Sequence, residues 1–128
     1  MQASEYPGHV LAYLGDAVLS LMVREYLVSL GYSKSKDLQE KSVQFVSAKA
    51  QAHFVESLLK ISYLTEEELE IYKRGRNHKS NTIPKNTDVV VYRKATGLEA
   101  LFGYWFLRKE EERMHNTFIN MIESTILK

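Results

Sequence analysis

Two long apolar segments constrain the fold of this chain more than any other feature. Residues 6–30 are apolar on nearly every face of a helix and are followed by Gly31, a residue type that often ends helices. We therefore expect a long central helix that is buried on most sides. The second segment, residues 89–108, contains a run of valines, but its larger apolar residues recur at helical spacing. These residues are Leu98, Leu101, Phe102, Trp105 and Phe106. They predict a second buried helix, capped by Thr87 or Asp88.

Four further helices are predicted from capping residues and amphipathic patterns. Ser33 or Ser35 can cap a short helix, and Ser47 can cap the next one. Residues 65–68 have the pattern of a capping box. The C-terminal segment starts with acids, ends with a lysine and carries an apolar stripe, which predicts an amphipathic helix. The chain is therefore expected to be an all-α protein of six or seven helices that forms one domain, residues 1–128.

Several classes of protein are excluded or disfavoured by composition. The chain contains no cysteine, which excludes disulfides, zinc held by thiolates and thiol nucleophiles. A metal ion would therefore need carboxylate oxygens or imidazoles. The N-terminus lacks the basic segment and apolar run of a secretory signal, and no apolar stretch reaches the ~20 residues of a membrane span. A cytoplasmic protein without a membrane partner is expected.

The charge of the chain is unevenly distributed. Its formal net charge is only +1, but residues 72–94 carry seven basic side chains against Asp88 alone. Turn-forming residues interrupt the helical pattern at 75–87, so a long basic loop is predicted. Such a concentration of charge is typical of proteins that bind a phosphate backbone. The side chains predicted to make these contacts are Lys73, Arg74, Arg76, Asn77, Lys79, Ser80 and Lys85. The alternative is a solvated loop that pairs with the acids of residues 66–70.

Two carboxylates, Asp16 and Glu99, stand in the middle of the two apolar segments. A buried, ionised carboxylate without a partner is too costly to persist, so each one needs a cation, a hydrogen-bond network or a raised pKa. Gly15 and Gly97 lie close to them in sequence and favour the close approach of another helix or a ligand. If the two carboxylates converge, they form an oxygen-ligand site suited to Mg²⁺ or Mn²⁺.

The same residues permit an interpretation without chemistry. Asp16 would then pair with Arg24 or Arg93, and Glu99 with a lysine, as buried salt bridges. His9 shares one helical face with Asp16 and could act as a ligand or as a base next to the site. The alternative for His9 is an ordinary half-buried histidine at the start of the helix.

The two carboxylate-bearing segments resemble the two catalytic motifs of the ribonuclease III domain. The sequence LAYLGDAVLSLMVREYL is similar to the signature helix of that family, which carries Gly-Asp-Ala-Val. The sequence TGLEALFGYWFL resembles its second catalytic segment, Asp-x-x-Glu-Ala-Leu-x-Gly. The likeness spans nearly the whole chain in order and spacing. Because the chain ends at Lys128, without room for the usual double-stranded-RNA-binding domain, it most resembles the Mini-III ribonuclease group.

This resemblance implies a Mg²⁺-dependent endonuclease that cuts double-stranded RNA as a homodimer, with Mn²⁺ able to replace Mg²⁺. For the Mini-III group it also implies maturation of the 23S ribosomal RNA precursor, assisted by a large-subunit ribosomal protein. Asp16 and Glu99 match catalytic metal ligands of the family. Tyr13 matches an aromatic position that packs across the dimer.

The chain departs from the resemblance at three positions. His9, Ala12 and Thr96 stand where ribonuclease III has further acids. We therefore expect water, Thr96 or Asp88 to complete the metal site. The missing acids also leave an alternative function, a non-catalytic dimeric RNA-binding or ribosome-associated module of the same fold. A third interpretation is an all-α adaptor that binds protein through its Tyr-rich and Trp-containing surface.

Overall fold

The computed structural model describes residues 1–78 and 88–128, and the described part of the chain is entirely helical apart from turns and short connections. A short 3-10 helix, η1 (Ala3–Glu5), precedes six α-helices. These are α1 (Gly8–Ser29), α2 (Ser35–Val46), α3 (Ala48–Lys60), α4 (Glu66–Arg76), α5 (Val89–Leu107) and α6 (Glu111–Ser124). The prediction of an all-α protein is confirmed. None of the helices described is long and apolar enough to cross a bilayer.

Three helices begin where their capping residues predict. The Ser47 hydroxyl accepts a hydrogen bond from the Ala50 backbone N–H at 3.1 Å and starts α3. Thr65 and Glu68 form the predicted capping box at the start of α4. The Asp88 carboxylate accepts hydrogen bonds of 2.8 and 3.1 Å from backbone N–H groups in the first turn of α5. This cap fixes the start of α5 in spite of the valines that follow it.

Two predicted helix ends are wrong. Neither Ser33 nor Ser35 caps α2, because Lys34 occupies the capping position and Ser35 is already the first helical residue. The C-terminal helix ends at Ser124 rather than at the terminal lysine. The Ser124 and Thr125 hydroxyls both donate to the Met121 carbonyl, so side chains satisfy a carbonyl that a further turn would otherwise use.

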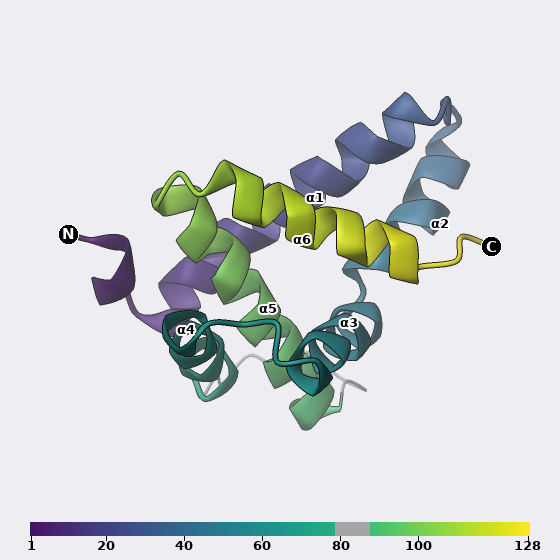
Figure 1. The fold of residues 1–128 in the computed structure, drawn as a ribbon. Coiled ribbons are helices and arrows are strands. Elements are labelled where there is room, and N and C mark those ends of the chain that lie inside the picture. Colours follow the sequence, from purple (N-terminus) through teal and green to yellow (C-terminus); the bar gives the residue numbers. More distant parts are fainter. Residues whose placement is uncertain (79–87) are drawn as a thin grey trace.

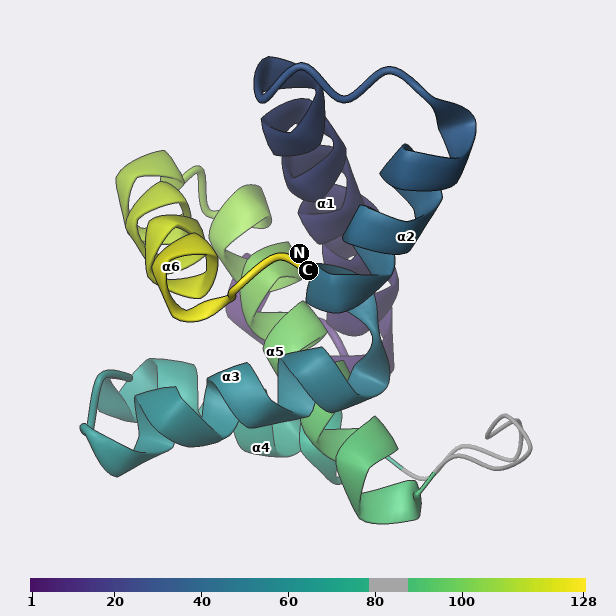
Figure 2. The same ribbon diagram turned by 90° about the vertical axis from the view of Figure 1, so that its right-hand side faces the viewer.

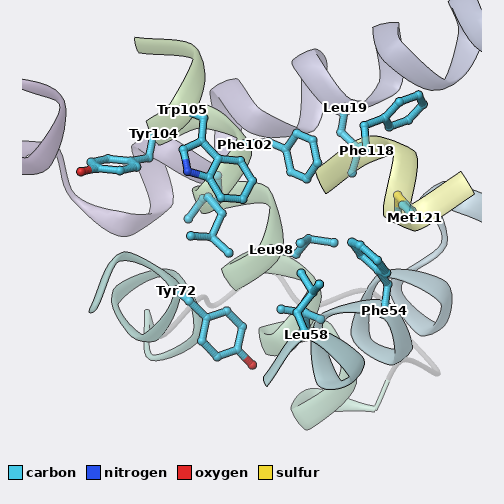
Figure 3. Packing of buried hydrophobic residues seen from close by; sticks show 14 of the residues in the cluster. Leu19, Phe54, Leu58, Tyr72, Leu98, Phe102, Tyr104, Trp105, Phe118 and Met121 are labelled. Carbon is cyan, nitrogen blue, oxygen red and sulfur yellow. The ribbon is translucent and has the colours of Figure 1, made fainter. Parts of the chain in front are cut away.

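Helix α5 forms the centre of the molecule. It packs against α1, α3, α4, α6 and η1, and Figures 1 and 2 show it passing between the other helices. Within the stretch 97–105, every residue of α5 is buried except Glu99, which is half-buried. Leu98 lies in the middle of the hydrophobic cluster, between Phe102 and Leu58 (Figure 3). The polar side chain of Glu99 is thus carried by the most buried element of the fold.

Helices α1 and α5 touch through their backbones. A Cβ atom added to Gly15 of α1 would lie 1.7 Å from the Glu99 carbonyl oxygen of α5. In the reverse direction, a Cβ atom on Gly103 of α5 would lie 2.0 Å from the Leu11 carbonyl oxygen of α1. No other residue type fits at either position without separating the helices. Because Asp16 follows Gly15, the same contact carries the Asp16 carboxylate to the side of Glu99.

A buried ionic network attaches α4 to α5 and α6. Glu68 is only 5% exposed and accepts hydrogen bonds from the Trp105 indole N–H at 2.8 Å and from Arg113 at 2.6 and 2.9 Å. Burial alone raises the pKa of Glu68, but the hydrogen bonds from Arg113, the Thr65 backbone and Trp105 outweigh it and hold the pKa below its usual value. The Arg113 guanidinium also lies 4.1 Å from the centroid of the Tyr63 ring.

Two acids of residues 66–70, Glu67 and Glu68, therefore pair with basic residues outside the basic loop. Glu67 pairs with Arg108 at 3.3 Å and accepts a hydrogen bond from the Tyr104 hydroxyl. Within the described residues, the ion pair from this acidic stretch to the basic segment joins Glu70 to Arg74, at 3.2 Å. Among residues 1–78 and 88–128, the Glu70–Arg74 pair is the one contact that fits the alternative interpretation of the basic loop.

Replacing Gly15 with alanine tests the backbone contact. We expect Gly15→Ala to lower the free energy of unfolding by about 3 kcal/mol or more, because the new methyl group meets backbone atoms that cannot move without separating α1 from α5. Urea denaturation followed by circular dichroism measures this loss. Gly31→Ala is the control, since its Cβ meets no atom within 4 Å and only its positive φ of 94° opposes the change, at about 1 kcal/mol. Equal losses in the two variants would contradict the proposed role of Gly15.

Candidate active site

Asp16 and Glu99 meet in one open pocket of about 500 Å³ between the first half of α1 and the first half of α5. The residues that line it are His9, Val10, Ala12, Tyr13, Asp16, His78, Tyr92, Thr96 and Glu99. Asp16 comes from the exposed side of α1, whereas Glu99 rises from the buried part of α5. The two carboxylates thus meet the condition that the sequence analysis set for an oxygen-ligand site, since they lie in one pocket.

The Asp16 carboxylate strongly perturbs the pKa of Glu99. Burial, a hydrogen bond to Asp16 and the negative charge of Asp16 raise the pKa of Glu99 to about 9, while a hydrogen bond from Gln51 opposes the shift. Near neutral pH, Glu99 therefore keeps its proton and donates it to the Asp16 carboxylate. A cation placed between the carboxylates would replace this proton, because positive charge favours the ionised form of both acids.

The interpretation of these acids as salt bridges finds no support in the part of the chain that the structure describes. Neither Asp16 nor Glu99 forms an ion pair with a basic residue of residues 1–78 or 88–128. Arg24 lines a different pocket, between α1 and α2. Each carboxylate instead lies beside the other one, which is the arrangement expected of a cation site.

His9 does not occupy the half-buried position that its alternative interpretation predicted. Its side chain is exposed and stacks on His78, with ring centroids 4.3 Å apart and ring planes 23° from parallel. This contact joins the start of α1 to the residues just after α4 at the rim of the pocket. Among the described residues, no three acidic or histidine side chains are placed to hold one metal ion, so His9 is not joined to Asp16 and Glu99 as a ligand.

The side chains expected to replace the missing acids are used elsewhere. Ala12 is apolar and buried, and the Thr96 hydroxyl donates to the Tyr92 carbonyl at 3.0 Å. The Asp88 carboxylate caps α5. Asp16 and Glu99 are therefore the carboxylates available here, and water would supply the other ligands. Such a set suits Mg²⁺, which keeps several waters and uses one or two carboxylates together with substrate phosphates.

The predicted RNA-binding residues fall into different groups. Lys73 and Asn77 are exposed at the end of α4, and the half-buried Arg76 lies beside them, with its guanidinium 5.6 Å from the centroid of the Tyr72 ring. Arg74 instead donates hydrogen bonds to the Ser4 and Tyr6 carbonyls at 2.6 and 3.2 Å, besides its pair with an acid. Its donors are thus used to hold the N-terminal segment, which corrects its prediction as a free phosphate contact. The remaining predicted contacts, Lys79, Ser80 and Lys85, lie outside the described residues.

The outer face of α1 is apolar and exposed. Tyr13, the residue predicted at a dimer interface, is 85% exposed, and Leu21 on the same helix is 68% exposed. Tyr13 also lines the pocket of Asp16 and Glu99. A surface that covers Tyr13 would therefore lie directly beside the carboxylates.

The sequence alone does not predict one residue near the site. Gln51 of α3 is 2% exposed and donates a hydrogen bond to the Val46 carbonyl at 3.2 Å, and it opposes the rise in the pKa of Glu99. A glutamine among the apolar residues of α3 was the one sequence signal that could have drawn attention to it. The sequence does not reveal that α3 packs against α5 at this point.

Comparison with known proteins supplies an independent line of argument. A family model described as the ribonuclease III domain matches residues 9–110. The chain is 50% identical over 107 residues to Mini-ribonuclease 3 of Enterococcus faecalis, covering 84% of this chain and 81% of the relative. It is 44% identical over 124 residues to Mini-ribonuclease 3 of Clostridium tetani, covering 91% and 78%.

A solved structure has the same fold. The crystal structure of a protein from Fusobacterium nucleatum superposes with a TM-score of 0.83 at 35% sequence identity and covers 93% of both chains. The likeness therefore includes the whole helical arrangement that positions the two carboxylates.

Replacing Glu99 with glutamine tests the raised pKa. Because the folded protein holds the Glu99 proton up to a pKa of about 9, against 4.5 for an ordinary glutamate, the folded state binds more protons than the unfolded state in this window. Wild-type stability must therefore fall as pH rises through it. Glutamine imitates the neutral acid, so we expect Glu99→Gln to melt several degrees above wild type at pH 8, in chelator, corresponding to ~1 kcal/mol or more.

The same experiment near pH 4 provides the control. There, wild-type Glu99 is protonated in both states, and the advantage of Glu99→Gln should vanish. Asp16→Asn should reduce the pH dependence of wild-type stability, because it removes the negative charge that raises the pKa of Glu99. Glu99→Gln that is less stable than wild type at pH 8 would contradict the assignment.

Proposed function

The chain belongs to the ribonuclease III domain family and, within it, to the Mini-ribonuclease 3 group, and from this membership we propose that it is a Mg²⁺-dependent enzyme that cleaves double-stranded RNA at the pocket of Asp16 and Glu99. Family membership makes it an endoribonuclease. The observation that carries the proposed site is the convergence of these two carboxylates from α1 and α5. The metal, the duplex substrate and the residues of the site are the proposal.

Asp16 and Glu99 would hold Mg²⁺, with Mn²⁺ as a substitute. When bound, Mg²⁺ supplies the positive charge and Lewis acidity that hydrolysis of a phosphodiester requires. Asp16 lies on the exposed side of α1, where a substrate phosphate would meet the bound cation. Glu99 would hold the cation in its ionised form, so binding of the cation would release the Glu99 proton to solvent.

Duplex RNA fits the basic side chains at the end of α4. The major groove of A-form RNA is too deep and narrow for side chains to reach the bases, so recognition depends on the phosphates and the shape of the helix. We propose that Lys73, Arg76 and Asn77 contact the RNA backbone, and that Lys79, Ser80 and Lys85 continue this surface. Lys73 is the most direct candidate because it is exposed and forms no ion pair with another described residue.

We further propose that the protein acts as a homodimer whose interface includes Tyr13. An aromatic side chain that is 85% exposed, on the apolar outer face of a central helix, is typical of a surface that another chain covers. A second copy bound there would lie beside the carboxylate pocket. Two pockets on one duplex could then serve the two RNA strands.

The biological substrate follows from the Mini-ribonuclease 3 group as a proposal. We propose that the protein trims the precursor of 23S ribosomal RNA in the cytoplasm, in complex with a large-subunit ribosomal protein. Identification of the bound RNA after crosslinking in cells is the direct test of this substrate.

Incubation of the protein with a long, end-labelled double-stranded RNA tests the activity. We expect cleavage in Mg²⁺, none in EDTA, and a loss of more than about 100-fold in the rate for Asp16→Asn. The variant should stay folded, because Asp16 is exposed and asparagine has nearly the same volume.

Glu25→Gln is the matched control, since it also neutralises an exposed carboxylate of α1 but lies outside the pocket. It should cleave at the wild-type rate. Asp16→Asn that cleaves as fast as wild type would remove Asp16 from the site. Wild-type protein that binds the duplex without cutting it would instead support the non-catalytic module.

The salt dependence of RNA binding tests the basic surface. If Lys73 contacts a phosphate, Lys73→Ala should reduce the slope of log Kd against log salt by about 1 and weaken binding to all duplex sequences alike. Arg74→Ala should instead lower the melting temperature, because it releases the carbonyls of Ser4 and Tyr6. Filter binding at several salt concentrations measures the slope. The assignment fails if Arg74→Ala changes the slope and Lys73→Ala does not.

A further inference from the structure

Two histidines at the rim of the carboxylate pocket have no part in the proposed cation site. His9 and His78 both line the pocket, and both side chains are exposed. Their rings stack on one another, with centroids 4.3 Å apart and planes 23° from parallel. Stacking uses the faces of the rings, whereas the ring nitrogens lie at the edges. Each imidazole therefore keeps an N–H donor that the stack does not use.

The neighbouring residues in the described part of the chain do not use these donors either. Side-chain hydrogen bonds at this end of α4 come from Arg74 and Arg76, and none of them involves a ring nitrogen of His9 or His78. Neither histidine forms an ion pair with a residue of 1–78 or 88–128. The donors of the stacked rings are thus directed to the solvent at the mouth of the pocket.

A polyanion that enters this pocket needs donors there. The pocket holds two acids, and no lysine or arginine is among the described residues that line it. His78 follows the basic end of α4, two residues after Arg76, and His9 precedes Asp16 by seven residues on α1. Seven residues of helix span ~10 Å. The histidines therefore lie between the basic end of α4 and the carboxylates, and a phosphate bound by them differs from the one at the cation.

Backbone contacts hold the two histidines in this position. A Cβ atom added to Gly8, the residue before His9, would lie 2.5 Å from the Arg74 carbonyl oxygen. The start of α1 is therefore pressed against the last turn of α4. The Arg74 side chain adds hydrogen bonds to the Ser4 and Tyr6 carbonyls. On the other side, the His78 backbone N–H donates to the Gly75 carbonyl at 3.4 Å. Both ends of the stack are attached to fixed backbone.

We propose that His9 and His78 together bind a phosphate of the RNA duplex next to the phosphate that meets the cation. This inference rests on the proposed function and deepens it, because it assigns the substrate contact between the cation and the basic end of α4. Hydrogen bonds to an ionised acceptor such as phosphate are roughly twice as strong as bonds between neutral groups. Two adjacent donors on fixed backbone can direct one backbone phosphate and so align the strand with Asp16 and Glu99.

Binding of double-stranded RNA in EDTA, where no cleavage is expected, tests the inference. His9→Phe and His78→Phe keep an aromatic ring for the stack but remove the N–H donors. We expect each variant to bind RNA about 10-fold more weakly than wild type, with a melting temperature close to that of wild type. Filter binding measures the affinity. The affinity of the free protein for Mn²⁺, measured by electron paramagnetic resonance, should not change.

Two further variants separate donation from stacking and from a general loss of histidine. His9→Gln removes the ring but keeps an N–H donor, so it should bind RNA more tightly than His9→Phe. His115 is an exposed histidine of α6 that lies beside a different pocket, and His115→Phe should bind RNA like wild type. If both His9→Phe and His78→Phe bind RNA as tightly as wild type, the histidines only join α1 to α4 and the inference is overturned.

Cleavage kinetics distinguish this inference from the proposed function. In His9→Phe, the KM for duplex RNA should rise by about 10-fold, while the Mg²⁺ concentration that gives half the maximal rate stays the same. Asp16→Asn should instead lose rate at every RNA concentration. Wild-type protein that neither binds nor cleaves duplex RNA would overturn the proposed function, and the inference with it. Wild-type and His9→Phe proteins that cleave with the same KM would overturn the role of the histidines alone.

Discussion

The close contact of α1 with α5 is the constraint on which the rest of the structure depends. Gly15 and Gly103 let each helix reach the backbone of the other, and a methyl group at either position would collide with a carbonyl oxygen. Since α5 also contacts α3, α4 and α6, a shift of α1 against α5 would disturb the whole helical packing. The same contact places Asp16 beside Glu99. Fold and site therefore share one requirement, a pair of helices without side chains between them.

The buried acid of the site, Glu99, lowers the stability of the fold. An apolar residue at position 99 would continue the buried surface of α5, whereas Glu99 lies beside another acid and has its pKa raised to about 9. Buried acids of this kind weaken a protein unless a proton or a cation accompanies them. The network at the start of α4 shows the opposite arrangement. There the buried Glu68 carboxylate is paired with Arg113 and accepts a hydrogen bond from the Trp105 indole N–H. The buried acid without a basic partner thus lies where chemistry is proposed.

Helix caps could be predicted from the sequence, whereas contacts between residues that are distant in the sequence could not. Ser47 and Asp88 cap their helices through atoms only two or three residues away, so their pattern was sufficient. The convergence of the two carboxylates followed from their unusual surroundings and from the family motifs. By contrast, the backbone contacts of Arg74 and the burial of Gln51 depend on how helices pack. Position in the sequence carries no sign of such contacts, because the same side chains are common on exposed helices.

The α1–α5 contact also sets the order in which the pocket can come into existence during synthesis. Asp16 and Glu99 stand 83 positions apart in the sequence, and each lies on a helix whose partner is the other one. Such long-range contacts form only after the intervening chain is available. A growing polypeptide that still lacks α5 therefore has an isolated Asp16 and no pocket shared with Glu99. The pocket of the two carboxylates comes into existence only when the central helix has left the ribosome.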